Sequence, residues 1–247
     1  MIRFIDKPNL PKGKVRTIIC GEYCDELNVC LDSLGIERLV IKPNNHIDPA
    51  VKYHADMAAI HLGDDKVLLD KQQVDLGENL KSRGFDICYT EREVTGEYPS
   101  DISLNFVVMS EYFIGKLECA DESLSAYIDR FKSINVKQGY CKCSCLVIDE
   151  NAVITDDISI YNALASNNID VLCVSKGDIL LPGHEYGFIG GASGKISKNE
   201  ILFFGDVTKH RDYKKIADFI KKHGCEIVSL DFTLTDFGGM IPLEEKV

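Results

Sequence analysis

The chain has 247 residues, of which 45% are hydrophobic and 27% are charged, a composition typical of a folded globular protein. Its formal net charge is −11 and no basic run exceeds two residues, so we expect no nucleic-acid partner and no binding to an anionic membrane surface. No segment approaches 18 consecutive apolar residues, which argues against a transmembrane helix.

The N-terminal sequence MIRFIDKPNLPKGKV has no apolar core of the kind that a secretory signal peptide requires. We therefore expect a cytoplasmic protein, in which the ten cysteines are mainly reduced thiols. Three of them, Cys88, Cys173 and Cys225, lie inside apolar runs, where a thiol behaves as a small core side chain.

In chain order, the predicted elements repeat one pattern of strand, strand, helix and strand. After a strand at 15–23, hairpins of two apolar runs around a polar turn are predicted at 57–70, 103–118, 144–155 and, turning near Lys198 and Asn199, after Gly187. Helices are predicted where apolar residues recur at i, i+3, i+4 and i+7. A weak helix is predicted at 73–83. The apolar stripes of the other four helices are Cys24, Leu27, Leu31 and Leu34; Leu124, Tyr127, Ile128 and Phe131; Ile158, Tyr161 and Ala165; and Tyr213, Ile216, Ala217 and Ile220.

The ends of these helices share a short pattern. Gly35, Gly84, Asn168 and Gly224 are each followed by an apolar residue, an acidic residue and an apolar strand, and Ser133 is a weaker fifth copy. Gly and Asn suit the left-handed position that ends a helix. The copies recur at spacings of 49, 49, 35 and 56 residues, which predicts five related units.

The units together indicate a single domain over residues 1–247, because no Pro-, Gly- or Ser-rich linker separates them. The first unit lacks one hairpin strand, and an apolar segment at 238–243 in the tail is a candidate to complete it. Such a strand would close the units into a ring and remove both sheet edges. The approximate units are 14–43, 54–92, 101–140, 141–178 and 187–232, with the tail 233–247 closing the ring.

Five such units in a closed ring resemble the pentein, or guanidino-group-modifying, superfamily, which includes deiminases, amidinotransferases, dimethylarginine dimethylaminohydrolases and a non-enzymatic ribosome anti-association factor. The resemblance implies an α/β propeller of five strand-strand-helix-strand units around a pseudo-fivefold axis. It further implies a central cavity where the inner strand ends converge, and a small cationic ligand that bears a guanidino or amidino group.

His54-Ala55-Asp56 is similar to the His-x-Asp motif of the deiminases, in which the His relays protons and a carboxylate holds the guanidinium. Imidazole titrates near neutrality, and a carboxylate can accept two parallel N–H bonds from a guanidinium. On a strand, side chains at i and i+2 point to the same face. The alternative is a solvent-exposed loop that leads into a strand.

The reactive cysteine of the amidine-modifying penteins follows a Gly-Gly pair in the last strand. Here the tail keeps Gly238-Gly239 and Pro242-Leu243 but has no cysteine after Cys225, so the family's nucleophile cannot be transferred to this position. Cys143 is the candidate replacement, with Lys142 nearby and His54 as the base that a thiol needs near neutral pH. If 141–145 is a strand, its three cysteines share one face; the alternative is that they are core thiols.

Further candidate ligand-binding residues lie at the starts of the predicted hairpins and in the tail: Asn105, Ser144, Gly190, Gly191, Ser193, Asp236, Gly238 and Gly239. The Gly-rich segment 187–194 lacks the helix and the Gly-Lys-Ser/Thr ending of nucleotide loops. Ser193 has no His partner that the sequence can place. The three cysteines at 141–145 lack the paired spacing of structural zinc sites, so no metal and no cofactor is expected.

Two functions therefore stay open. The first is an enzyme that hydrolyses a small guanidino or amidino compound with Cys143, His54 and Asp56 as catalytic residues. The second is a non-catalytic member of the fold that binds a ligand or a partner. The His54–Asp56 pair favours the first function, and the missing tail cysteine favours the second. The sequence leaves the oligomeric state open.

Overall fold

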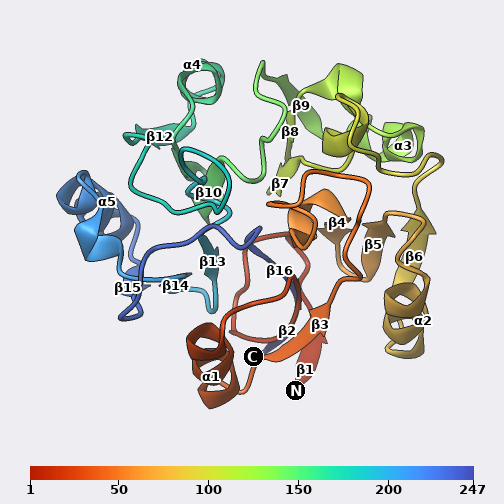
Figure 1. Cartoon of the computed structure of the whole chain (residues 1–247), viewed down its shortest axis with the longest axis horizontal. Helices are drawn as coiled ribbons and strands as arrows, with labels where there is room; N and C mark the ends of the chain where they lie inside the picture. Colours follow the sequence, from red (N-terminus) through yellow and green to blue (C-terminus); the bar gives the residue numbers. More distant parts are fainter.

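A computed structural model describes residues 1–247 and contains five small sheets with one α-helix for each sheet. The five units lie around a common centre, with the helices at the periphery and the strands closer to the middle (Figure 1). The predicted α/β propeller of five strand-strand-helix-strand units is confirmed.

Four of the units are continuous in sequence and share one topology. In each, the first strand is antiparallel to the second, and the third is parallel to the second after a helical crossover. A parallel neighbour requires such a crossover because the chain must return to the same sheet end. The elements are β4 (Ala59–Gly63), β5 (Lys66–Leu69), α2 (Val74–Ser82) and β6 (Asp86–Tyr89); β7 (Val107–Met109), β8 (Tyr112–Gly115), α3 (Ser125–Ile128) and β9 (Lys132–Asn135); β10 (Cys145–Asp149), β11 (Ala152–Thr155), α4 (Ile158–Ala165) and β12 (Asp170–Cys173); and β13 (Ser193–Lys195), β14 (Glu200–Phe203), α5 (Tyr213–Lys222) and β15 (Glu226–Val228).

The remaining unit joins the two ends of the chain. It consists of β2 (Lys14–Cys20), α1 (Asp25–Ser33), β3 (Glu37–Val40) and the C-terminal β16 (Met240–Lys246), which runs antiparallel to β2 with Met240 opposite Cys20. The predicted tail strand that completes the first unit is thus confirmed. A further strand, β1 (Ile2–Phe4), pairs with the other side of β16 and was not predicted from the sequence.

The apolar core lies between neighbouring units. One cluster of 15 buried residues joins Ile154 of β11 to Phe203 of β14 and Ile216 of α5. Another joins Ile19 of β2 and Leu243 of β16 to Leu69 of β5. Since burying apolar surface is the main driving force of folding, each unit depends on its neighbours for stability.

The predicted helix ends are correct at Gly35, Gly84, Asn168 and Gly224, each of which has a positive φ angle. The fifth, at Ser133, is wrong because Ser133 lies inside β9, opposite Phe113 of β8. The third helix is also shorter than its apolar stripe predicts. It has only four residues, after the 3₁₀ helix η4 (Glu122–Leu124), and ends before Phe131.

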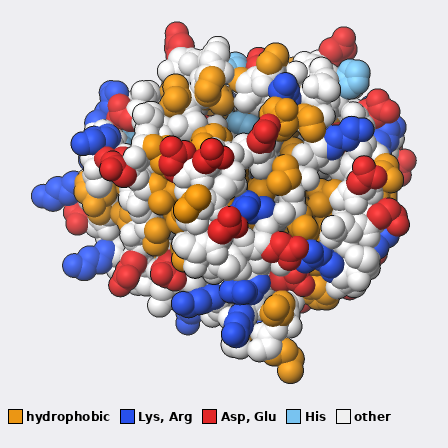
Figure 2. All heavy atoms as spheres, turned by 60° about the horizontal axis from the view of Figure 1, so that its bottom comes forward, with side chains coloured by type: hydrophobic (Ala, Val, Ile, Leu, Met, Phe, Trp, Pro, Cys, Tyr) orange, Lys and Arg blue, Asp and Glu red, His pale blue; other side chains and the backbone are white.

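Four more 3₁₀ turns are η1 (Ala55–Met57), η2 (Ser100–Ile102), η3 (Leu117–Cys119) and η5 (Val207–Lys209). None of the helices has the length and apolarity needed to cross a bilayer. On the face shown in Figure 2, acidic and basic side chains are interspersed, and Lys and Arg side chains gather near its lower edge.

Candidate functional site

His54 and Asp56 lie on a tight turn, not on the strand that the sequence predicts. His54 has an extended backbone and precedes η1, in which Asp56 is the middle residue. The alternation of side chains along a strand therefore does not apply to this pair. Both are nevertheless buried, with exposed fractions of 4% and 2%, so the alternative of an exposed loop is also wrong.

Cys143 lies in the turn that precedes β10, and Cys145 is the first residue of that strand. The prediction that three cysteines share one face of a strand is therefore wrong. The fold nonetheless brings Cys143 of the fourth unit to His54 and Asp56 of the second. One donor atom of each side chain lies within 4.8 Å of the other two, and all three residues are buried.

Asn105 holds these two segments together from the third unit. Its side-chain oxygen accepts hydrogen bonds from the backbone N–H groups of Lys142 (2.7 Å) and Cys143 (3.3 Å). Its Nδ2 donates to the Asp56 carbonyl and to the Cys143 Sγ, both at 3.1 Å. A buried amide with this many partners fixes the relative position of the turns that it joins.

Asp236 approaches the same place from the C-terminal tail. Its carboxylate accepts hydrogen bonds from the backbone N–H groups of Phe188 and Gly238, each at 2.9 Å, and its Oδ1 lies 3.8 Å from the His54 Nδ1. A Cβ atom on Gly191 would overlap this carboxylate. A Cβ on Gly238, whose φ angle is +79°, would overlap His54. These two glycines let the tail pack directly against the histidine.

A cavity of about 310 Å³ opens above this cluster, and three predicted residues, His54, Cys143 and Asp236, line it. Asp56 and Asn105 lie behind them and do not line it. The wall is completed by Asp48, Val51, Tyr140, Leu181, His184, Glu185, Tyr186 and Phe188. The lining thus contains three carboxylates and three aromatic rings but no Lys or Arg side chain.

The other predicted ligand-binding residues do not line this cavity. Gly190 and Ser193 line a separate space of only about 10 Å³, and the Ser193 hydroxyl donates to the Ile189 carbonyl. Ser144 is fully buried, and its hydroxyl has no hydrogen-bond partner. The Gly239 carbonyl accepts a hydrogen bond from Tyr23.

The sequence reasoning missed the acidic and aromatic wall of the cavity. Asp48 belongs to the connection between the first and second units, whereas Glu185, Tyr186 and Phe188 belong to the connection between β12 and β13. That second connection, at 174–192, is long and contains no helix or named strand. Long connections of this kind often carry functional residues, and this signal could have identified it.

Comparisons with known proteins agree with this architecture. A model of a family of unknown function, DUF6873, matches residues 18–241. The chain belongs to the DUF6873 family. No curated protein sequence matches it.

Solved structures show that this DUF6873 member has the pentein fold. The inosamine-phosphate amidinotransferase StrB1 from Streptomyces griseus is similar with a TM-score of 0.62 at 12% identity, covering 96% of this chain and 94% of that one. The amidinotransferase SxtG from Microseira wollei gives 0.59 at 10% identity, with coverages of 93% and 92%. The agmatine deiminase of C. jejuni gives 0.53 at 12% identity, with coverages of 94% and 90%.

Burial dominates the electrostatics of the cluster in this DUF6873 protein. It raises the pKa of the Cys143 thiol well above the ordinary value, and the negative charges of Asp56 and Asp236 raise it further, whereas the Asn105 hydrogen bond lowers it. Burial also raises the pKa of Asp56, while the charges of His54 and Lys142 lower it. No N–H or O–H group hydrogen-bonds to the Asp56 carboxylate, which faces the Cys143 thiol. Burial and the two carboxylates therefore favour a neutral Cys143 thiol.

Thiolate, imidazole and carboxylate are also ligand types that bind zinc. The sequence spacing gave no indication of such a set, because its members come from two units that only the fold brings together.

Proposed function

We propose that the cavity binds a small cation that carries a guanidino or amidino group. The observation that carries this proposal is the lining: Asp48, Glu185 and Asp236 supply negative charge, and no Lys or Arg side chain opposes it. Tyr140 and Phe188, whose rings stack with centroids 6.2 Å apart, offer flat faces to a planar cation. The names of the fold neighbours, which include amidinotransferases and an agmatine deiminase, point to the same chemical class.

We further propose that Cys143 attacks the central carbon of the bound group. The thiol gives its proton to His54 as the carbon–sulfur bond forms, a carbon–nitrogen bond then breaks, and the amine or ammonia that leaves takes that proton from His54. Water then attacks the same carbon, loses a proton to His54 and releases the thiol. The net reaction consumes one water molecule and exchanges a nitrogen for an oxygen at that carbon.

The cation itself would help to ionise the thiol. Burial and the charges of Asp56 and Asp236 raise the pKa of the Cys143 thiol and so favour its neutral form. A guanidinium close to Sγ adds a positive charge that opposes both carboxylates, and this lowers the pKa of the thiol. Attack would therefore depend on the presence of the ligand that is attacked.

The second candidate function is cation binding without a reaction. The raised pKa of Cys143 and the Gly238-Gly239 tail without a cysteine favour it. Both functions share the same cavity and the same acidic lining, so one set of measurements separates them.

The test incubates the full chain with guanidine, acetamidine and simple alkylguanidines, and follows the melting temperature and the release of amine or ammonia. We expect at least one cation to raise the melting temperature and Asp236→Asn to weaken that effect. If the protein is an enzyme, Cys143→Ser should lower turnover by about 10³-fold or more while the cation still binds. Cys88 is a half-buried thiol outside the cavity. Cys88→Ser should therefore change neither the turnover nor the effect of the cation on the melting temperature.

Cation binding is contradicted if no compound raises the melting temperature of the wild type by more than it raises that of Asp236→Asn. Binding with no turnover would instead favour the non-catalytic function. Full turnover by Cys143→Ser would end the role of Cys143 as nucleophile.

A further inference from the structure

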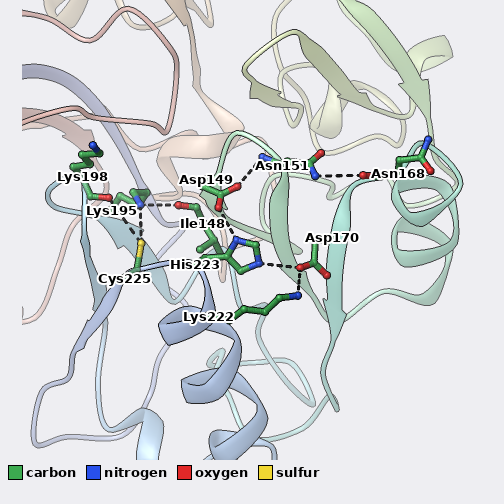
Figure 3. Close-up of polar contacts among 10 residues, drawn as sticks. All are labelled: Ile148, Asp149, Asn151, Asn168, Asp170, Lys195, Lys198, Lys222, His223 and Cys225. Carbon is green, nitrogen blue, oxygen red and sulfur yellow. Dashed lines mark hydrogen bonds and ion pairs between the residues drawn. The ribbon is translucent and has the colours of Figure 1, made fainter.

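Lys195, at the end of β13, is a buried amine without a carboxylate partner. Its exposed fraction is 4%, and its Nζ contacts two groups, the Ile148 carbonyl oxygen at 2.6 Å and the Cys225 Sγ at 3.3 Å (Figure 3). Burial lowers the pKa of Lys195, although the Cys225 sulfur and the charge of Asp149 raise it, so this amine loses its proton more readily than that of an exposed lysine. The amine donates to the Ile148 carbonyl and to the Cys225 sulfur, whereas the Cys225 S–H donates to the Lys198 carbonyl at 3.8 Å.

The amine and the thiol share a cavity on another part of the molecule. This space of about 160 Å³ is lined by both Lys195 and Cys225, with Lys7, Lys198 and His223 among the other lining residues. None of His54, Cys143 and Asp236 lines it. A small polar molecule the size of hydrogen peroxide can therefore reach both reactive groups without entering the candidate functional site.

Cys225 is also set apart from the other cysteines. It is the only one whose sulfur hydrogen-bonds a lysine amine. The Cys143 sulfur contacts the Asn105 amide, and the Cys88 sulfur lies 3.9 Å from the Tyr127 hydroxyl. An amide and a phenol are poor nucleophiles near neutral pH, whereas a neutral amine is a good one.

We propose that Lys195 and Cys225 form a reversible covalent cross-link when the protein meets peroxide. Peroxide first oxidises the Cys225 thiol to a sulfenic acid and releases water. The Lys195 amine then attacks the sulfur, the sulfur–oxygen bond breaks, and the hydroxide leaves with a proton from nitrogen as a second water molecule. The product is a sulfenamide, and two equivalents of a thiol reductant return the free amine and thiol as they become a disulfide.

The cross-link would tie the two ends of the fifth unit together. Lys195 ends the first strand of this sheet, whereas Cys225 immediately precedes its last strand, β15. The nitrogen keeps one hydrogen, so it can still donate to Ile148 in β10 of the fourth unit. The boundary between these two units is therefore preserved and strengthened.

The test treats the full chain with hydrogen peroxide, digests it under non-reducing conditions and analyses the peptides by mass spectrometry. We expect a linked pair that contains Lys195 and Cys225, about 2 Da lighter than the two free peptides together, as oxidation to sulfenic acid followed by loss of water requires. Dithiothreitol should abolish it. Lys195→Arg keeps a long hydrogen-bond donor at this position and removes the attacking amine, so its Cys225 should stop at sulfenic or sulfinic acid.

Two results would overturn the proposal. One is a wild-type chain in which Cys225 is oxidised to sulfenic or sulfinic acid while Lys195 stays unlinked, so that Cys225 behaves as it should in Lys195→Arg. The other is a linked pair about 14 Da heavier than the free peptides, because that mass requires an oxygen between nitrogen and sulfur and not a direct bond. Cys88 serves as the internal control: it meets the same peroxide but has no adjacent amine, so it should form no link to a lysine.

Discussion

Asp156 shows what burial does to a single carboxyl group. It directly follows β11, is 5% exposed, and neither of its oxygens has a hydrogen-bond partner. Burial raises the pKa of Asp156 to about 7, although the positive charge of Lys176 and the backbone N–H of Ile189 lower it. The group is therefore protonated in the folded protein over a pH range in which it is ionised in the unfolded chain.

This shift makes stability depend on pH with a definite sign. The folded state holds the proton more tightly, so the stability linked to Asp156 is complete below about pH 4 and is lost as the pH rises through about 7. Asp156→Asn removes the titration. We expect it to raise the free energy of unfolding by roughly 1–3 kcal/mol at pH 8.5 and to have little effect at pH 4, as measured by urea denaturation. A gain of equal size at both pH values would contradict this account.

The candidate site was only partly predictable at the scale of residues. The positions of His54, Asp56, Cys143 and Asp236 follow from polar residues at hairpin starts and in the tail. Their geometry does not, because a 3₁₀ turn and an irregular turn replace the strands that period-two reasoning assumes. Asn105 was placed in the site, but its role as a bridge between two units depends on contacts nearly 40 and 50 residues away in sequence.

Among the elements, α5 best illustrates how a sequence stripe becomes a packed face. Ile216 and Ile220 are buried, whereas Lys214 is exposed, as the stripe predicts. Ile216 packs in the cluster that joins α5 to the fourth unit. The stripe is informative here because α5 has ten residues, whereas α3 has only four and its stripe begins in η4 and ends at a bend before β9.

We expect Ile216→Ala to lower the free energy of unfolding by about 2–5 kcal/mol, since it removes buried carbon atoms and leaves a cavity. Lys214→Ala, on the exposed side of the same helix, should change it by less than about 0.5 kcal/mol. Chemical denaturation of the two variants side by side checks this. Equal losses would mean that α5 contributes through helix propensity and not through packing.

The whole molecule depends on how its two ends meet. β16 pairs with β2 on one side and with β1 on the other, and the Met1 amino group lies 3.4 Å from the Val247 carbonyl oxygen. The ring was predictable from the recurrence of helix ends and from the missing strand of the first unit. The strand β1 was not predictable from the sequence, because three residues before a Pro-containing segment give no periodic signal.

The protein should therefore tolerate a covalent link between its termini but not the loss of its C-terminal strand. Joining residue 247 to residue 1 through a short Gly-Ser linker and opening the chain between Glu97 and Tyr98, both exposed, should leave the melting temperature within a few degrees of the wild type. Deleting residues 238–247, which contain β16, should abolish cooperative unfolding. A truncated chain that still melts cooperatively would show that the first unit does not require its C-terminal strand.

The pairing of β16 with β2 also determines how long the edge of β2 stays unpaired while the chain is synthesised. Cys20 of β2 and its partner Met240 of β16 are 240 − 20 = 220 residues apart, so this edge of β2 stays unpaired while the residues between them are synthesised, on the order of tens of seconds at ordinary elongation rates. Contacts this distant in sequence also slow folding after release. The nascent protein therefore exposes an apolar strand edge that its finished form never shows, and this is the stage at which aggregation or chaperone capture would act on it.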